Sequence, residues 1–213
     1  MKVFHNQRRE LATIVRQRSF RQEAAMALSA FDCFTHGEKV PYASSELTTG
    51  RRCYDLMRAH GAQDSQHLRR QMGNAAYQQA LWQPNAEAAN AFARTLSRRL
   101  QECVITPAPF TAPGWSQHEY LAFWEQLIRT RARCVYFNSG WQYSNGCTYE
   151  LTVATHAGVP TFDAAGTALS AEAGAQLIAA AIAELEAEGF APTALISHRA
   201  ALSRLAARNA AGG

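Results

Sequence analysis

Residues 134–151 constrain the fold of this chain more than any other segment. The segment opens with four apolar residues that are typical of a buried strand, and it continues through a polar loop with two glycines. It ends in a helical pattern that carries Glu150 in its first turns. A strand that runs through a short loop into a helix is typical of parallel sheets, whose neighbouring strands need helical crossovers. The chain therefore needs further strands beside this one.

Strands and helices alternate along the rest of the chain. Strands are predicted at residues 40–44, 103–106, 134–137 and 159–162. Helices are predicted at residues 7–31, 53–60, 86–100, 116–130, 145–156, 170–188 and 200–207. This alternation predicts an α/β fold. We expect a flavodoxin-like or Rossmann-like parallel sheet of four to five strands, sandwiched by helices, with an extra N-terminal helix.

The length suits a single domain over residues 1–213, because 213 residues of which 47% are hydrophobic can enclose one sizeable core. Residues 1–36 are predicted to form an N-terminal helical extension. Residues 37–213 are predicted to form the α/β core, with a helical insertion around residues 62–85. The extension carries an arginine cluster, which is either a solvated face or a surface for an anion or a partner: Arg8, Arg9, Arg16, Arg18 and Arg21.

Charge and cysteine content narrow the class of protein. Lys and Arg outnumber Asp and Glu by 21 to 17, but they form no tight basic stripe, so we do not expect nucleic-acid binding. The five cysteines show neither CxxC nor metal-like spacing, and we expect no metal and no cofactor. Cys103 and Cys134 fall in predicted strands as core thiols, which indicates a reducing compartment. No signal peptide and no membrane-spanning run is evident, so we expect a cytoplasmic protein.

Ligands of open parallel sheets bind beyond the carboxyl ends of the strands. The loops that follow the first three predicted strands should therefore converge on one site: residues 48–52, 107–114 and 140–146. The first loop is a polar turn with Gly50, between a strand and a helix. Such a turn binds an anion on backbone N–H groups or simply caps the helix.

The third loop combines small and aromatic residues ahead of a predicted helix. Gly140 and Gly146 permit close backbone approach, and Ser144 can cap the helix or bind a phosphate oxygen. Trp141 and Tyr143 suit either a flat ligand ring or core packing.

Glu150 is the candidate for chemistry. Near a helix N-terminus the macrodipole favours the ionised carboxylate. A fixed carboxylate at the mouth of a crevice can act as a nucleophile toward an electrophilic carbon. The alternative is an exposed glutamate that stabilises its own helix.

Residues 140–150 read Gly-Trp-Gln-Tyr-Ser-Asn-Gly-Cys-Thr-Tyr-Glu, and a helix with Ala154 and then Gly158-Val-Pro160 follow. This stretch resembles the nucleoside 2-deoxyribosyltransferase-like superfamily, which includes deoxyribosyltransferases, nucleoside 5′-monophosphate N-glycosidases and CMP hydrolases. The resemblance covers about residues 40–162 and is strongest in residues 116–160. It implies an enzyme, an N-glycoside hydrolase or a deoxyribosyltransferase, in which a glutamate attacks C1′ of a (deoxy)ribose and the base leaves.

The resemblance also implies roles for individual residues. Glu150 matches the nucleophile. Superfamily members carry an acidic residue on the preceding helix that contacts the base or sugar, and its spacing matches Glu125. The superfamily usually has Asp at that position, and a second Asp where Arg133 stands here. The residues that would bind the substrate, including its 5′-phosphate, are Tyr42, Thr48, Thr49, Gly50, Arg51, Gly140, Trp141, Ser144 and Gly146.

The implied substrate is a (deoxy)nucleoside 5′-monophosphate or a nucleoside. The monophosphate is favoured because the turn at residues 48–52 offers many anion donors. Hydrolysis and base exchange both stay open. Superfamily members often build the site at a subunit interface, so we expect a homodimer or larger assembly, with residues 170–188 as one candidate contact. Two rival hypotheses are a catalytically inactive nucleotide-binding sensor and a protein-interaction module that docks through its N-terminal helix.

Overall fold

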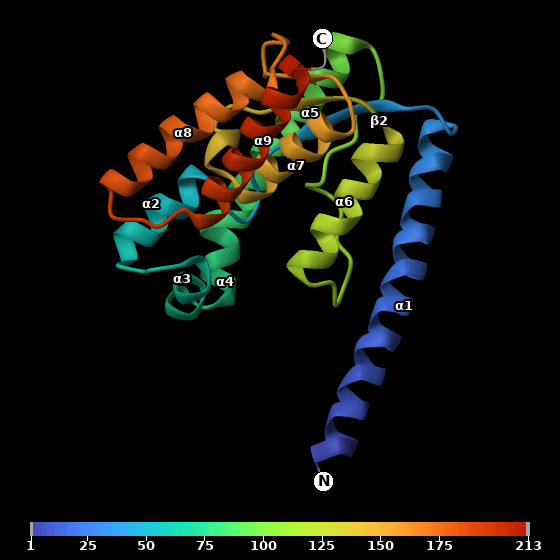
Figure 1. The fold of residues 1–213 in the computed structure, drawn as a ribbon, viewed down its shortest axis with the longest axis vertical. Coiled ribbons are helices and arrows are strands. Elements are labelled where there is room, and N and C mark those ends of the chain that lie inside the picture. The colour runs from blue at the N-terminus through green and yellow to red at the C-terminus, as the bar shows by residue number, and fades with distance from the viewer. Residues whose placement is uncertain (1, 212–213) are drawn as a thin grey trace.

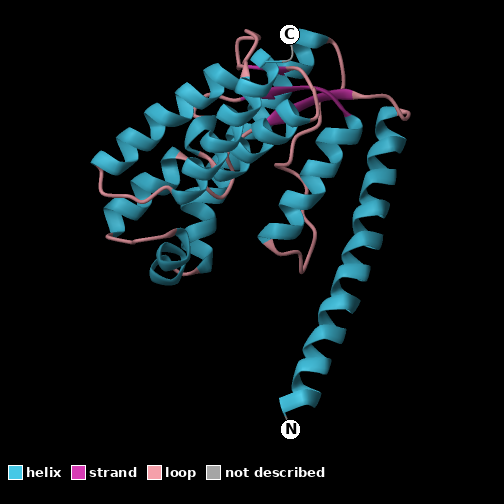
Figure 2. Cartoon of the chain, in the orientation of Figure 1, coloured by secondary structure: helices cyan, strands magenta, loops and turns pink. Residues whose placement is uncertain are grey.

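The computed structural model describes the backbone of residues 2–211 and the side chains of residues 16–208. It is an α/β fold with a small sheet among many helices (Figures 1 and 2). Arg8 and Arg9 of the arginine cluster lie outside the described side chains. The elements run along the chain in the order α1 Lys2–Thr35, β1 Val40–Ser44, α2 Arg51–His60, α3 Ser65–Met72, α4 Asn74–Tyr77, η1 Gln78–Trp82, α5 Gln83–Leu100, α6 Gln117–Arg131, β2 Ala132–Phe137, η2 Trp141–Tyr143, α7 Asn145–His156, β3 Thr161–Phe162, α8 Ala171–Ala187 and α9 Thr193–Ala211.

The described residues form one parallel sheet of three strands in the order β1-β2-β3, rather than the predicted four to five. Tyr42 of β1 lies opposite Val135 of β2, which in turn lies opposite Thr161 of β3. All three strands point the same way, so their carboxyl ends meet at one edge of the sheet.

The segment predicted as a strand at residues 103–106 contributes only a single bridge beside β1. Ile105 pairs with Tyr42 in parallel, donating to the Pro41 carbonyl at 3.0 Å and accepting from the Ala43 N–H at 2.8 Å. The ladder stops there because the next donors on either side would be Pro41 and Pro107, and proline has no N–H to donate. Cys103 is consequently exposed, whereas Cys134 is buried as predicted.

Helices cover both faces of the sheet, as the alternation of strand side chains requires. Ala43 and Tyr136 pack in a cluster with Leu96 of α5 on one face. Val135 packs in the main core with Phe123 of α6 and with residues of α7, α8 and α9 on the other face. Every residue of β1 is buried.

Helix α1 is longer than predicted and lies beside α6, and its N-terminal part projects beyond the rest of the chain (Figure 1). Ala24 and Leu28 bury one side of it in the main core. The helix ends at Thr35, before His36 and Gly37, which both adopt left-handed conformations. This part of α1 is therefore integrated with the domain.

The helical insertion expected around residues 62–85 is present: residues 65–72 form α3, and residues 74–85 form α4, η1 and the start of α5. Leu68, Tyr77 and Leu81 pack with Cys53 and Met57 of α2 in a second core cluster. The predicted helix start at residue 86 is too late, because Pro84 occupies the first turn of α5 and the chain enters it directly from η1.

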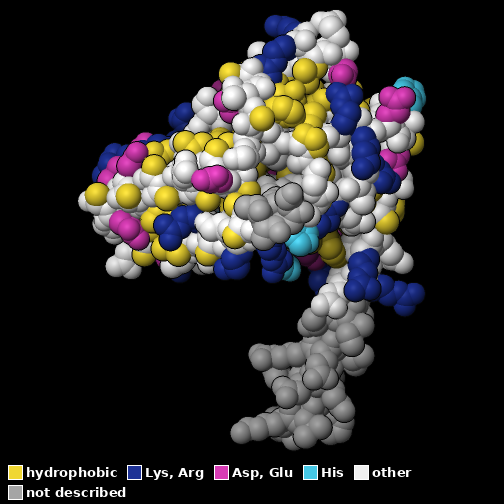
Figure 3. Space-filling view, turned by 45° about the horizontal axis from the view of Figure 1, so that its top comes forward, with side chains coloured by type: hydrophobic (Ala, Val, Ile, Leu, Met, Phe, Trp, Pro, Cys, Tyr) yellow, Lys and Arg dark blue, Asp and Glu magenta, His cyan; other side chains and the backbone are white. Residues whose placement is uncertain are grey.

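Among the described residues, none of the helices combines the length and the apolar character that a bilayer crossing requires. On the face drawn in Figure 3, basic and acidic side chains are interspersed.

Candidate active site

A cavity of about 390 Å³ opens beyond the carboxyl ends of β1 and β2. The three loops predicted to converge all contribute to it, through Thr48 and Thr49, through Pro107 to Thr111, and through Ser144 and Gly146. Its volume falls in the range of small-molecule sites. The lining residues are Ser45, Leu47, Thr48, Thr49, Gln78, Trp82, Pro107, Ala108, Phe110, Thr111, Gln117, Tyr120, Leu121, Trp124, Ser144, Gly146, Cys147 and Glu150.

Glu150 lines this cavity from the second turn of α7, and its side chain is held at both oxygens. The Tyr42 hydroxyl donates to Oε1 at 2.7 Å, and the Ser44 hydroxyl donates to Oε2 at 2.6 Å. Both donors come from β1, so the sheet fixes the orientation of the carboxylate. Glu150 is only 6% exposed, and the alternative of an exposed helix-start glutamate is therefore wrong.

Burial raises the pKa of Glu150 to about 7, although the hydrogen bonds from Ser44 and Tyr42 oppose that rise. The expectation that the macrodipole favours the ionised form of this carboxyl did not include the effect of burial, which raises its pKa. Near neutral pH, Glu150 is therefore present in both its ionised and its protonated form. A pKa close to the working pH is typical of catalytic carboxyl groups.

Ser44→Ala tests how the carboxylate is tuned. The ionised form would lose a charge-assisted hydrogen bond, so the pKa of Glu150 should rise by roughly one to two units. Carbon-13 NMR titration of labelled glutamate carboxyls measures this pKa. Ser45→Ala is the matched control, because the neighbouring hydroxyl does not bond to Glu150. A titration midpoint at or below that of the unmodified protein would contradict this tuning.

The hydroxyl groups of Ser144 and Thr49 both accept backbone N–H groups at the N-terminus of α7. The Ser144 hydroxyl accepts the Cys147 N–H at 3.4 Å, and the Thr49 hydroxyl accepts the Asn145 N–H at 3.1 Å. The two hydroxyls lie 3.2 Å apart, and both residues line the cavity. Ser144 therefore fills the capping role and faces the cavity at the same time.

The turn predicted to bind phosphate is occupied by a carboxylate of the protein itself. Glu46 Oε2 accepts the Arg51 N–H at 3.2 Å, and a Cβ on Gly50 would lie 1.7 Å from the same oxygen. Gly50 has φ 115°, so both its backbone and its neighbour exclude a side chain. Thr48 reaches the cavity, whereas Gly50 and Arg51 do not line it.

The Arg51 side chain points to acidic partners. It bonds to Glu188 at 2.6 Å and to Asp55 at 3.2 Å, and it lies 5.7 Å from the centre of the Tyr143 ring. Arg52, the next residue, donates to Asn85. Both guanidinium groups are therefore held by protein partners.

Trp141 and Gly140 shape the loop without lining the cavity. Trp141 is 4% exposed and packs against Phe137, with ring centres 5.1 Å apart, so the core-packing alternative holds for it. Gly140 has φ 84° at the turn before η2.

Four other aromatic residues line the cavity, and the loop motif did not identify them: Trp82, Phe110, Tyr120 and Trp124. Tyr120 and Trp124 share one face of α6 with Gln117 and Leu121, a spacing that the sequence does show. Trp82 lies in η1, a π-helix closed by the Gln83 N–H donating to the Gln78 carbonyl. Single turns of π-helix are frequent at functional sites.

Glu125 does not line the cavity. Its carboxylate accepts hydrogen bonds from the Tyr149 hydroxyl and from Arg129 Nε, the latter at 2.9 Å. The structure therefore does not bring Glu125 together with Glu150, although Tyr149 is the residue before Glu150. Arg133 points elsewhere and pairs with Glu102 at 2.6 Å.

Ser45 is a cavity residue that the motif did not single out. It is 6% exposed, and its hydroxyl has no hydrogen-bond partner among the described residues. A buried hydroxyl without a partner is costly in free energy, so its position on the cavity indicates a ligand or water partner.

No cluster of three or more His, Cys, Asp or Glu side chains in the described part of the chain has an arrangement suited to a metal ion. Comparison of the chain with models of protein families, with curated proteins and with solved structures finds no match.

Proposed function

We propose that this protein cleaves the N-glycosidic bond of a nucleoside, either by hydrolysis or by exchange of the base. Glu150 is the nucleophile that attacks C1′ of the sugar. The observation that carries the proposal is the buried Glu150 carboxylate, oriented by Tyr42 and Ser44, on a cavity with aromatic lining. The resemblance of residues 140–150 to the nucleoside 2-deoxyribosyltransferase-like superfamily supports the same chemistry.

The reaction proceeds in two displacements. A Glu150 oxygen forms a bond to C1′ while the C1′–N bond breaks, and the bonding electrons leave on the base nitrogen, which takes a proton from water. Water then attacks C1′ of the glycosyl ester, its second proton is released to solvent, and Glu150 returns as carboxylate. If a second base attacks instead, the net reaction is base exchange. Tyr42 and Ser44 hold the carboxylate in line throughout.

The charges around the cavity favour a nucleoside over the monophosphate that the sequence favoured. No lysine or arginine is found among the described residues that line the cavity. Arg51 is paired with Glu188, and Glu46 already accepts the Arg51 N–H. A phosphate dianion would have to enter beside the Glu150 carboxylate without a paired cation, which is unfavourable.

The aromatic lining suits the base. Trp82, Phe110, Tyr120 and Trp124 offer flat surfaces, and stacking of a base on an aromatic ring is worth about 1–3 kcal/mol. The hydroxyl groups of Ser45, Thr48 and Thr49 suit the sugar.

The test is release of free base. The protein is incubated with a panel of ribonucleosides, deoxynucleosides and their 5′-monophosphates, with and without a second base, and the products are separated by chromatography. We expect base release from at least one nucleoside and at least tenfold less from its monophosphate. Binding of nucleosides without any product would instead support the nucleotide-binding sensor.

Ser45→Ala is expected to weaken recognition of the sugar. Loss of a hydrogen bond to a sugar hydroxyl should lower kcat/KM about tenfold. The loss should vanish for the one substrate analogue, 2′-deoxy, 3′-deoxy or 5′-deoxy, that lacks the bonded hydroxyl. An equal loss for every analogue would argue against a sugar contact.

Assembly as a homodimer or larger oligomer, and a cytoplasmic location, belong to the same proposal. Leu177 on α8, the candidate contact helix, is 43% exposed, which supports a contact there. The five unpaired cysteines suit a reducing compartment. Light scattering coupled to size exclusion measures the assembly.

A further inference from the structure

We infer that α1 positions the aromatic side of the cavity through a group of contacts centred on Arg16, and so sets ligand affinity. Residues 107–116 and the first turns of α6 supply Phe110, Thr111, Gln117 and Tyr120 to the cavity. The inference rests on the proposed function for the identity of the ligand, but the positioning itself does not depend on it. We call Arg16, Glu23, Trp115 and Glu119 the Arg16 clasp.

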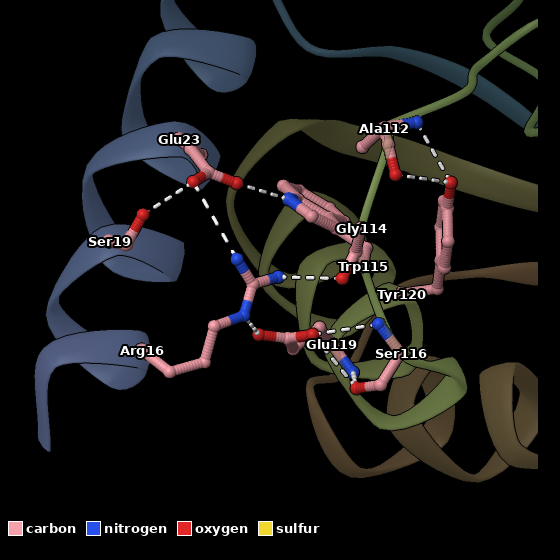
Figure 4. Close-up of polar contacts among 9 residues, drawn as sticks. All are labelled: Arg16, Ser19, Glu23, Ala112, Gly114, Trp115, Ser116, Glu119 and Tyr120. Atoms are coloured by element: carbon pink, nitrogen blue, oxygen red, sulfur yellow. Dashed lines mark hydrogen bonds and ion pairs between the residues drawn. The ribbon is translucent and has the colours of Figure 1, made fainter. Parts of the chain in front are cut away.

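The Arg16 clasp joins α1 to the loop and to the N-terminus of α6 (Figure 4). Arg16 pairs with Glu119 at 2.8 Å and donates to the Gly114 carbonyl at 3.1 Å. Glu23, about two turns further along α1, accepts the Trp115 indole N–H at 2.6 Å. Arg16 therefore binds two points of a segment about one hundred residues away in the chain, and Glu23 binds a third.

Glu119 links the clasp to the start of α6. Its carboxylate accepts the Ser116 N–H at 2.7 Å, which completes the capping box of α6. The hydrogen bond from Arg16 lowers the pKa of Glu119 most, and the hydrogen bond from the Ser116 backbone lowers it further, to about 2. The contact thus stays ionic throughout the pH range in which the protein would act.

Aromatic contacts continue from α1 to the cavity. Phe20 packs edge-on against Trp115, with ring centres 5.0 Å apart, and Phe31 lies 6.1 Å from Phe110. Phe110 stacks on Phe123 at 4.9 Å and lines the cavity. Each ring is in contact range of the next, so displacement of α1 would displace a cavity residue.

The loop depends on such contacts because it has little regular structure of its own. Pro107, Pro109 and Pro113 remove backbone donors from it. On the cavity side, the Tyr120 hydroxyl donates to the Ala112 carbonyl at 3.1 Å and accepts the Ala112 N–H at 2.8 Å. Tyr120 thus holds the loop from one side and the Arg16 clasp holds it from the other.

Glu150 is held differently. Its two hydrogen-bond donors lie on β1, and its own helix is α7. Loss of the contacts between α1 and residues 107–119 should therefore weaken binding of the base in the cavity, but the position of Glu150 should not change. A positioning role of this kind affects KM and not kcat.

The test is Arg16→Ala in the full chain, with Arg18→Ala, an exposed arginine on the same helix, as the matched control. Hydrogen exchange of residues 110–116 should accelerate about tenfold in Arg16→Ala, because the variant loses the contacts of the guanidinium with the Gly114 carbonyl and with Glu119. KM for the nucleoside found to be a substrate should rise about tenfold, with kcat within about twofold. Arg16→Lys, which keeps the charge without the planar fork, should recover part of the loss.

The outcomes separate the inference from the proposed function. Unchanged exchange in residues 110–116 together with an unchanged KM would overturn the inference, and so would a loss confined to kcat. If no nucleoside is a substrate, the proposed function fails while the exchange measurement still decides the positioning. If Arg16→Ala lowers the melting temperature too far for study, Glu23→Gln tests the same group and should accelerate exchange around Trp115.

Discussion

Glu150→Gln is expected to abolish base release while leaving nucleoside binding intact. The amide has nearly the shape of the carboxyl group but no negative charge and no nucleophilic oxygen, so kcat should fall roughly 10⁴-fold, the scale of losing a nucleophile. One of the Tyr42 and Ser44 hydroxyls can still donate to the amide oxygen while the other rotates to accept from the amide NH2, so the cavity keeps its shape. Calorimetric binding and chromatographic assay of the same preparation measure both quantities.

Glu172→Gln provides the matched control, since it makes the same change on an exposed glutamate of α8. Glu125→Gln tests the hypothesis, drawn from the sequence, that Glu125 assists departure of the base, although Glu125 does not line the cavity. A loss in Glu125→Gln comparable with that in Glu150→Gln would support a role in base departure, whereas activity within a few-fold of the unmodified protein would fit its position outside the cavity. Full activity in Glu150→Gln would end the proposal of a glutamate nucleophile.

Activity is expected to fall steeply as the pH drops below about 7. The nucleophile must be ionised, and burial raises the pKa of Glu150 to about 7. Below that value the ionised fraction falls about tenfold per pH unit, so kcat/KM at pH 5 should be about 100-fold below its plateau at pH 8 or above. The pH–rate profile of the best nucleoside measures this limb. A flat profile between pH 5 and pH 8 would show that no group with this pKa controls the reaction.

The titration of Glu150 should also affect the stability of the protein, but with the opposite dependence on pH: stability should fall as the pH rises, whereas activity should increase. The folded state holds the Glu150 proton more tightly than an unfolded chain with the ordinary pKa of 4.5. The resulting stabilisation is fully present below pH 4.5 and is lost as the pH rises to about 7, a change on the order of 3 kcal/mol. Glu150→Gln should therefore melt at a higher temperature than the unmodified protein at pH 8, and the difference should shrink at pH 4.5.

The sequence predicted well whatever depends on local pattern. Ser144 was predicted as a possible cap and is the N-cap of α7, which begins at Asn145 as expected, and α8 begins at Ala171, one residue after the predicted start. Glu150 was identified because a glycine-containing loop follows a buried strand, and strand ends converge in parallel sheets. These features lie within a few residues of one another in the chain.

The parts that the sequence did not predict depend on contacts between distant segments. Arg51 appeared free to bind phosphate, but it pairs with Glu188, which lies 137 positions further on. Glu125 has the spacing of a site residue, but its partners Tyr149 and Arg129 hold it elsewhere. Burial of Glu150 by the assembled domain outweighed the local macrodipole.

The π-helix η1 has a consequence for how the cavity could change between related sequences. A π-helical turn holds one more residue than an α-helical turn, so it is equivalent to a one-residue insertion in a continuous helix. Deletion of one residue between Gln78 and Trp82 would restore α-helical pairing and rotate Gln78 by about 100° relative to Trp82. A change in chain length of a single residue, far from Glu150 in sequence, could thus replace the side chain that faces the ligand and redirect specificity without altering the reacting group.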